Sequence, residues 1–448
     1  MKLRHIIFSA IMLLIFPVSC DKMLDLAPHQ NVSGTISLGS DQGVRKVLIG
    51  AYARFAGPSI YGGCILRNSE LLGAGDECRW TGVFTGPRQI FMKQIDPANE
   101  DITSQWLDSY EVVSIANTVL SAIDMVNETD RDRVEGEALF LRSLIFFDLV
   151  RFYAQQYRYG ELNSQYGIPL VLTPASRSEK PAGKGRDSVE DVYDRVIADL
   201  QEAALKLPNE NGAYASSGAA TALLARVYLQ KGDYLNAGNA ANEVILSGKY
   251  ELLSDFKDAF NNDENSPEDI FATQITPQDQ RSSMTEFFSV PEYGGRDGDI
   301  EILERHLSLY SPGDRRLSLF FQGNGAMRTG KWNNPYGVVS LIRLAEMYLI
   351  RAECNFRLGT NLGDTPLNDY NVIHTRAGLS PAHSVTLDDI LLERRLELAF
   401  EGFRIHDQRR LHQEVGTLPF DAPALVFPVP AREISADPVL AGQQNEGY

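Results

Sequence analysis

Long stretches of the chain repeat apolar residues at the three- and four-residue spacing of an α-helix. One stretch covers residues 102–120, and a second covers residues 134–152, whose middle is nearly all apolar. Ser188, with Asp191 three positions later, forms a capping-box pattern before a third periodic stretch that stops at Pro208. Because each helix must bury its apolar face, these stretches predict a mostly α-helical protein whose second long helix is central and buried.

Residues 217–247 have the pattern of two helices that pack antiparallel to each other. Ala225 and Tyr228 precede a turn at Gly232 and Asp233. These positions resemble the tetratricopeptide repeat, in which small residues let paired helices approach closely. Further helices are predicted at 341–358, 367–376 and 387–403. We therefore predict a scaffold of tetratricopeptide-like helix pairs, joined to an irregular, loop-rich half that binds a ligand.

Two segments, residues 57–98 and 254–336, are too rich in glycine or other turn-forming residues for long helices. Both nevertheless hold large aromatic side chains, which disordered segments lack. We interpret them as ordered surface loops, since long irregular segments inside a compact domain usually carry function. The sequence thus predicts a single domain over residues 36–448 with its ligand regions in these two segments.

The two loop-rich segments combine aromatic and polar side chains in the way that sugar binding requires. An aromatic ring can stack on the apolar C–H face of a sugar, while polar groups bond its hydroxyls. The candidate ligand-binding residues are Asp76, Arg79, Trp80, Phe84, Tyr293, Trp332 and Tyr336. For each of them alone, burial against the helices is the alternative, so the ligand hypothesis depends on the cluster.

The first 20 residues have the features of a bacterial lipoprotein signal. Lys2 and Arg4 precede an apolar run, residues 6–16, that is too short to span a bilayer, and Ser19 provides the small residue that cleavage needs before Cys20. We predict a signal peptide at 1–19, lipid on Cys20 and a tether over 20–35. An ordinary signal peptide is the alternative.

The charge of the chain excludes two classes of partner. The net charge is -17, and cleavage of the basic signal makes the mature protein more acidic. A nucleic acid needs a basic face, so none is expected as a partner. Adsorption to an anionic membrane is disfavoured for the same reason, so the predicted lipid must provide the membrane anchor. An apolar content of 44% is enough for a full core.

Two motifs resemble ligand loops without meeting their requirements. Residues 325–331 have the spacing of a phosphate-binding loop, but Trp332 stands where Mg²⁺ binding needs a hydroxyl, so nucleotide binding is excluded. Asp297, Asp299 and Glu301 alternate like the start of a calcium loop, yet the glycine that such a loop needs is absent. We interpret them as an acidic turn, with a weak calcium site as the alternative, and predict no metal.

Glu397 and Glu401 are predicted to share one helix face, where paired carboxylates could act as general acid and base. Many arginines flank them and would lower the pKa of both carboxyls, which is wrong for a general acid. We therefore interpret the pair as structural. No other catalytic set is visible in the sequence, so we expect no enzyme and no cofactor.

Three cysteines remain after Cys20. Cys64 and Cys78 flank a glycine-rich loop, and they either form a disulfide or remain unpaired small side chains. Cys354 falls in a strongly apolar helix pattern and is predicted to be buried packing.

Several separated segments together resemble the SusD/RagB family of outer-membrane nutrient-binding lipoproteins. They are Cys20 with Asp21; Trp106, Tyr110, Ala116 and Asn117; residues 344–353; residues 393–402; and the C-terminal residues 426–430 and 444–448. Gln408 and the pair Leu411 and His412 depart from the usual family pattern.

The resemblance implies a helical domain built on repeat-like helix pairs, with the ligand site in its irregular half. It also implies a non-enzymatic protein on the outer membrane, facing the exterior, that delivers a nutrient to a SusC-like TonB-dependent barrel. Ligands in the family are often glycans and sometimes peptides. An oligosaccharide is therefore the leading hypothesis, and a peptide carrier or a protein-binding helical scaffold are the alternatives.

Overall fold

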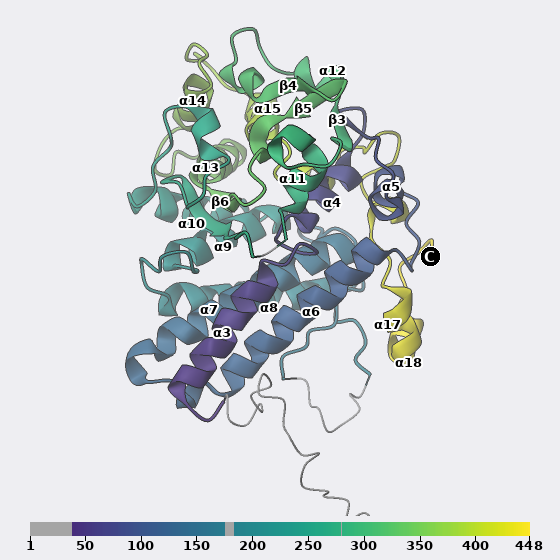
Figure 1. Ribbon diagram of the computed structural model, residues 1–448. Helices are drawn as coiled ribbons and strands as arrows, with labels where there is room; N and C mark the ends of the chain where they lie inside the picture. Colours follow the sequence, from purple (N-terminus) through teal and green to yellow (C-terminus); the bar gives the residue numbers. More distant parts are fainter. Residues whose placement is uncertain (1–37, 175–182, 279) are drawn as a thin grey trace, which may run out of the picture.

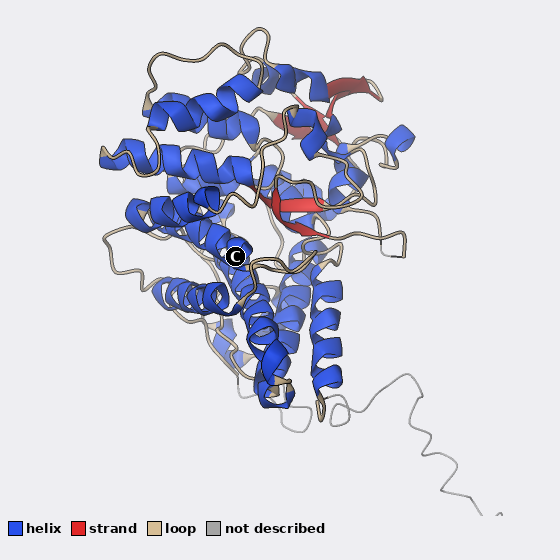
Figure 2. Cartoon of the chain, turned by 90° about the vertical axis from the view of Figure 1, so that its left-hand side faces the viewer, coloured by secondary structure: helices blue, strands red, loops and turns tan. Residues whose placement is uncertain are grey.

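The computed structural model describes residues 38–174, 183–278 and 280–448. Helices dominate this part of the chain, as Figure 2 shows, which confirms the predicted mostly α-helical class. The predicted signal peptide, Cys20 and the tether all fall outside the described residues.

Helices that follow one another along the chain pack side by side, from α3 in the lower part of Figure 1 to α14 at its upper left. They are α3 (Asp41–Phe55), α6 (Glu100–Ser121), α7 (Glu128–Tyr153), α8 (Val189–Lys206), α9 (Ser217–Lys231), α10 (Tyr234–Leu246), α13 (Leu344–Leu358) and α14 (Pro366–Arg376). The capping box predicted at the start of α8 is half formed: the Ser188 side chain accepts the backbone N–H of Asp191, but the Asp191 carboxylate bonds the Ser188 hydroxyl and not its backbone N–H. The pair α9 and α10 follows the predicted turn, with Gly232 in the left-handed conformation.

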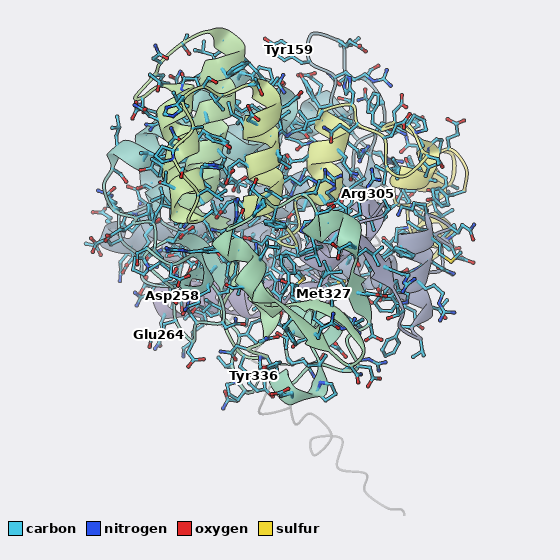
Figure 3. The ribbon with its side chains drawn as sticks, turned by 90° about the horizontal axis from the view of Figure 1, so that it is seen from above. Tyr159, Asp258, Glu264, Arg305, Met327 and Tyr336 are labelled. Carbon is cyan, nitrogen blue, oxygen red and sulfur yellow. The ribbon has the colours of Figure 1, made fainter. Side chains whose placement is uncertain are left out.

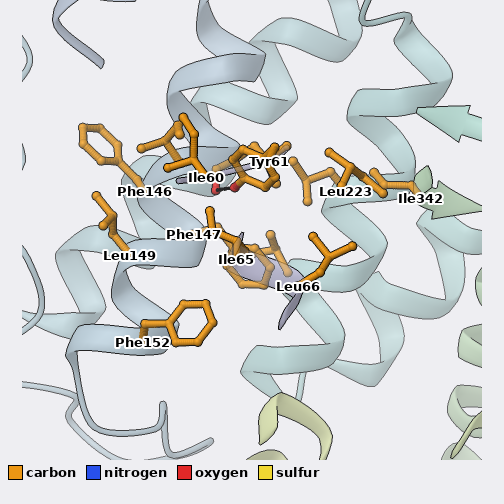
Figure 4. Close-up of a cluster of buried hydrophobic side chains, with 14 of the residues drawn as sticks. Ile60, Tyr61, Ile65, Leu66, Phe146, Phe147, Leu149, Phe152, Leu223 and Ile342 are labelled. Atoms are coloured by element: carbon orange, nitrogen blue, oxygen red, sulfur yellow. Dashed lines mark hydrogen bonds between the residues drawn. The ribbon is translucent and has the colours of Figure 1, made fainter. Parts of the chain in front are cut away.

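Helix α7 is the central buried helix that the sequence predicted. Its aromatic side chains enter a core shared with the start of α4 and with α9 and β6, drawn in Figure 4. The Tyr61 hydroxyl donates to the Leu144 carbonyl at 3.1 Å and to the Asp148 carboxylate, so this phenol is satisfied inside the core. No helix within the described ranges is both long enough and apolar enough to cross a bilayer.

The loop-rich half lies above α3, α6, α7 and α8 and beside α13 and α14 in Figure 1, and it contains short helices and strand pairs. Its helices are α4 (Cys64–Gly73), α5 (Thr85–Met92), α11 (Ser283–Phe288) and α12 (Glu304–Leu307). Antiparallel pairs join β1 (Cys78–Trp80) to β3 (Ile300–Ile302), β2 (Asp269–Thr273) to β6 (Val339–Arg343), and β4 (Phe320–Gly323) to β5 (Ala326–Thr329).

The prediction that residues 57–98 and 254–336 are not helical is wrong, because the first segment contains α4 and α5 and the second contains the short helices α11 and α12. Every residue of α4 is buried, and the glycines lie at the helix ends, with Gly63 as the N-cap and Gly73 as the last residue. Glycine is unfavourable in a helix interior but acceptable at the ends, and counting glycines did not separate the two cases.

The remaining short elements complete the chain. They are α15 (Leu387–Glu397), α16 (Arg404–Arg410), α17 (Ala431–Ala436), α18 (Pro438–Ala441), and the 3₁₀ turns η2 (Ile123–Met125), η3 (Phe256–Ala259), η4 (Pro291–Tyr293), η5 (Arg315–Leu319), η6 (Gly330–Trp332) and η7 (Pro423–Leu425). The helix predicted over 387–403 is too long, because it ends at Glu397 and the chain then turns through left-handed Phe400 and Gly402. The helix predicted over 341–358 begins later, since its first residues belong to β6.

Arg186 ties the C-terminal segment to the end of α7. Its guanidinium and backbone N–H groups donate to Gln443, while the guanidinium also donates to Asn445 and to the carbonyls of Tyr153, Tyr166 and Gly167. A buried guanidinium needs most of its donors satisfied, and here segments far apart in the sequence supply the acceptors.

Candidate functional site

A cleft of about 720 Å³ opens where the two loop-rich segments meet the helical layer. The first segment contributes α4 and α5, the second contributes α11, and the N-terminal turn of α6 closes the third side. The volume is within the range of small-molecule sites in proteins. The cleft thus joins both segments predicted to bind ligand.

Two phenylalanine rings form the apolar wall of the cleft. Phe84 is 43% exposed and meets Phe287 edge to face, with ring centroids 5.9 Å apart. The guanidinium of Arg296 lies over the Phe84 ring at 4.3 Å. Trp80 packs behind Phe287 at 5.6 Å between ring centroids. Phe84 therefore offers accessible ring surface, and Phe287 and Trp80 hold it in place.

Arg67 of α4 reaches the cleft from below and is only 3% exposed. It donates to Asp101 Oδ2 at 2.5 Å and to Asn68 Oδ1 at 2.9 Å, and its guanidinium lies 4.7 Å from the Phe287 ring centroid. A salt bridge, a side-chain amide and an aromatic face thus fix one buried cation beneath the apolar wall.

Carboxylates outnumber cations in the lining. Asp96, Glu100, Asp101 and Glu286 line the cleft, against the single guanidinium of Arg67. Glu286 is half-buried, and its carboxylate makes no ion pair or hydrogen bond with any other residue in the described ranges. The resulting negative potential disfavours an anionic ligand and leaves acceptor oxygens available for hydroxyl or ammonium groups.

The two predicted tryptophans do not present stacking faces to a ligand. Trp80 is 6% exposed and supports Phe287 from behind. Trp332 is 5% exposed, and its indole N–H donates to the Phe400 carbonyl at 3.0 Å. The expectation that these two rings stack directly on sugar thus does not fit their burial, and the alternative of packing against the core applies to both.

The predicted polar residues Asp76 and Arg79 lie outside the cleft lining. Asp76 forms an exposed ion pair with Arg305 at 2.8 Å, and Arg79 pairs with Glu301 across the β1–β3 ladder at 3.0 Å. Each charge therefore already has a partner at the surface.

Tyr293 and Tyr336 are accessible but do not join Phe84. Tyr293 is 37% exposed and meets Phe321 edge to face, at 5.6 Å between ring centroids. Tyr336 is 40% exposed and lies at the edge of the molecule in Figure 3, well away from Arg305. Of the seven predicted residues, only Phe84 lines the cleft, and the ligand roles of the two tyrosines stay predictions.

Sequence reasoning missed Arg67, Glu286 and Phe287. Phe287 is an aromatic residue of the second loop-rich segment, which was the available signal. Arg67 and Glu286 gave no local signal, because their importance comes from contacts between segments far apart in the chain.

The structural interpretation of Glu397 and Glu401 is confirmed by a buried ion network. Arg343 donates to Glu401 at 2.8 Å and to Glu397 at 3.1 Å, and Lys331 donates to Glu401 at 2.6 Å. Burial alone would raise the pKa of Glu397, but Arg376, Arg343 and other cations outweigh it and hold that pKa well below its usual range. The two carboxylates do not share a helix face, since α15 ends at Glu397.

The other sequence motifs also have structural explanations. The apparent phosphate loop is not a loop: it begins at Gly325 in the left-handed turn of the β4–β5 hairpin, and its other residues form β5 and the start of η6. Within the described ranges, no group of three or more acidic, histidine or cysteine side chains is placed to share a metal ion.

The three cysteines within the described ranges are free and buried. The disulfide that the sequence left open between Cys64 and Cys78 is therefore absent. Cys354 packs in the main core, which confirms its predicted role.

Comparisons with known proteins agree on one family. A SusD family profile matches residues 193–422, and a profile described as starch-binding associating with outer membrane matches residues 81–229. A SusD-like protein of Bacteroides ovatus is 23% identical over 455 residues, which covers 88% of this chain and 80% of that protein.

Solved structures share the fold. A SusD superfamily protein from Bacteroides vulgatus has a TM-score of 0.81 at 24% identity, covering 91% of this chain and 99% of that one. A putative sugar binding protein from the same species has a TM-score of 0.80 at 24% identity, covering 92% and 99%.

Proposed function

Because this chain belongs to the SusD family of nutrient-binding proteins, we propose that it captures a neutral oligosaccharide in the cleft between α4, α5, α6 and α11. The observation that carries the proposal is the accessible Phe84 ring beside unpaired carboxylate oxygens in one hollow. A sugar offers an apolar face to the ring and hydroxyl donors to the carboxylates.

The charge of the cleft narrows the ligand class. The lining carries four carboxylates and the buried guanidinium of Arg67, and Arg296 adds a second cation over the Phe84 ring. The remaining excess of negative charge would repel uronic acids and sulfated sugars, whereas a neutral sugar meets no such repulsion. A basic peptide is the second candidate, because the unpaired Glu286 would also accept an ammonium group.

The proposal includes a membrane setting and a partner. Lipid on Cys20 would hold the protein at the outer membrane through the tether over 20–35, and a SusC-like TonB-dependent barrel would receive the ligand. The protein would act by binding and release, without a cofactor and without chemistry of its own.

Isothermal titration against neutral oligosaccharides, uronate-containing oligosaccharides and lysine-rich peptides tests the proposal. The variants are Phe84→Ala and Glu286→Gln, with Phe356→Ala as a control, because Phe356 is 38% exposed and lines neither the cleft nor any predicted ligand region. We expect Phe84→Ala to weaken binding of a neutral oligosaccharide by about tenfold, which corresponds to about 1.4 kcal/mol, and Phe356→Ala to leave it unchanged.

Each other outcome has a defined meaning. Glu286→Gln should strengthen binding of uronate-containing sugars relative to neutral ones, because it removes one repelling charge. If only the peptides bind, and Glu286→Gln abolishes that binding, the peptide function replaces the saccharide function. If Phe84→Ala binds every ligand as tightly as the wild type, the cleft is not the site.

A further inference from the structure

A second hollow of about 420 Å³ lies in the helical half. Its walls come from residues 156–161 after α7, the turn between α9 and α10, and residues 410–421 after α16. Viewed from above in Figure 3, Tyr159 of this hollow lies at the opposite edge of the molecule from Tyr336. None of its lining residues lines the first cleft.

Aromatic side chains line this second hollow and are accessible. Tyr159 is 71% exposed, and its base packs closely on the α9–α10 turn. If Gly232 in this turn carried a Cβ, that atom would lie 3.0 Å from the Cβ of Tyr159. The His412 ring stacks on Phe420 with centroids 4.1 Å apart and an angle of 13° between the planes. Tyr234 completes the aromatic part of the lining. Flat ring surface is thus available from two of the three walls.

The stack of His412 on Phe420 is held by its backbone. His412 has φ of 54°, in the left-handed region that residues other than glycine seldom adopt. Its N–H donates to the Arg409 carbonyl at 3.2 Å, and the next residue, Gln413, bonds back to Gln408 at 2.8 Å. These two bonds form the Schellman cap that ends α16, in which a left-handed residue after the C-cap is usual. The cap fixes the backbone of His412 and so helps to hold the position of its ring before any ligand binds.

The rim of the second hollow has charged side chains that make no hydrogen bonds to one another. Arg158 lies 3.7 Å from the Glu161 carboxylate and 3.6 Å from that of Asp421, distances too long for hydrogen bonds. The three side chains are 46%, 62% and 41% exposed. One guanidinium that can donate hydrogen bonds and two carboxylates that can accept them therefore face solvent beside the rings.

We propose that this hollow is a second saccharide-binding site, separate from the first cleft, which takes one or two sugar units of a neutral glycan. Tyr159 and the ring pair of His412 and Phe420 would contact the apolar faces of the sugar, and Arg158, Glu161 and Asp421 would bond its hydroxyls. This inference does not depend on the function proposed for the first cleft.

Saturation-transfer NMR on the mature protein tests the second site directly. The probes are maltose, cellobiose, laminaribiose and xylobiose, each at millimolar concentration. Tyr159→Ala and Phe420→Ala remove the second site, and Phe84→Ala impairs the first cleft. Leu162→Ala is the matched control, because Leu162 is 84% exposed close to Tyr159 along the chain and does not line the hollow.

We expect at least one disaccharide whose signal persists in Phe84→Ala, falls at least threefold in Tyr159→Ala and in Phe420→Ala, and is unchanged in Leu162→Ala. A signal that Phe84→Ala abolishes, or that neither second-site variant reduces, would overturn the second site while leaving the first cleft intact. Absence of signal from every probe would overturn the proposal.

Discussion

Glu70 should make the free energy of unfolding fall as the pH rises from 5 to 8. Its side chain is 4% exposed, and it accepts the backbone N–H groups of Gly402 at 2.8 Å and Phe403 at 3.1 Å. Burial raises the pKa of Glu70 from 4.5 to about 7, against the lowering effect of these backbone hydrogen bonds and of Arg404. The folded protein therefore keeps this proton at pH values where the unfolded chain has lost it.

The two pKa values set the size and the sign of the effect. Between pH 4.5 and 7 the folded state binds more protons than the unfolded state, so stability decreases as the pH rises. At 1.36 kcal/mol per pKa unit, the two values give a loss of about 2.5 kcal/mol between pH 5 and pH 8. Glu70→Gln removes the titrating group, and with it this part of the pH dependence.

Urea unfolding followed by circular dichroism at pH 5, 6.5 and 8 measures the effect. The difference in free energy of unfolding, Glu70→Gln minus wild type, should rise by about 2.5 kcal/mol from pH 5 to pH 8. Glu77→Gln is the matched control. Burial alone would raise the pKa of Glu77, but His306, Arg404 and Arg395 outweigh burial and hold this pKa far below its usual value. The ionised Glu77 carboxylate contributes its full stabilisation above about pH 5 and loses it only at lower pH. The free energy of unfolding of Glu77→Gln minus that of the wild type should therefore be the same at pH 5, 6.5 and 8.

A difference for Glu70→Gln that changes by less than about 0.5 kcal/mol across this range would refute the reasoning. It would mean that the backbone donors of Gly402 and Phe403 keep the carboxylate ionised despite its burial.

Two further substitutions test the core. Arg343→Met removes the one described cation that contacts all three buried carboxylates of Glu268, Glu397 and Glu401, while Arg376 still bridges the first two. The free energy of unfolding should fall by about 3–5 kcal/mol, and a loss below about 1 kcal/mol in urea would contradict this. Trp332→Phe removes the hydrogen-bond donor to the Phe400 carbonyl, so the free energy of unfolding should fall by about 1–3 kcal/mol while the affinity for saccharide stays unchanged. A variant that keeps its stability but loses saccharide affinity would mean that the indole contacts the ligand.

The parts of the fold that depend on nearby residues could be predicted from the sequence. The Ser188 cap depends on Asp191 three positions away, and the α9–α10 pair depends on a turn at Gly232. The end of α15 was not predictable in this way, because the apolar pattern continues past Glu397 while tertiary contacts hold Phe400 in a left-handed conformation.

The candidate site could be predicted only as a region. Both loop-rich segments do line the cleft, but whether an aromatic side chain there faces solvent depends on tertiary packing. Trp80 and Trp332 are aromatic residues of the same loop-rich segments as Phe84, yet both are buried. Trp80 lies in β1, which pairs with β3, and the Trp332 indole N–H bonds to the Phe400 carbonyl. The contact of Arg67 with Asp101 joins two helices, and no local pattern encodes it.

The Arg186 contacts have a consequence for the order of folding during synthesis. Gln443 and Asn445, which supply part of its acceptors, lie 257 and 259 residues after Arg186 in the chain. The carbonyl of Phe152 likewise accepts a bond from the backbone N–H of Phe427, which is made much later. The polar groups at the end of α7 therefore stay bonded to water until these later residues have been made, and a protein truncated before Gln443 would lack the acceptors that close this junction.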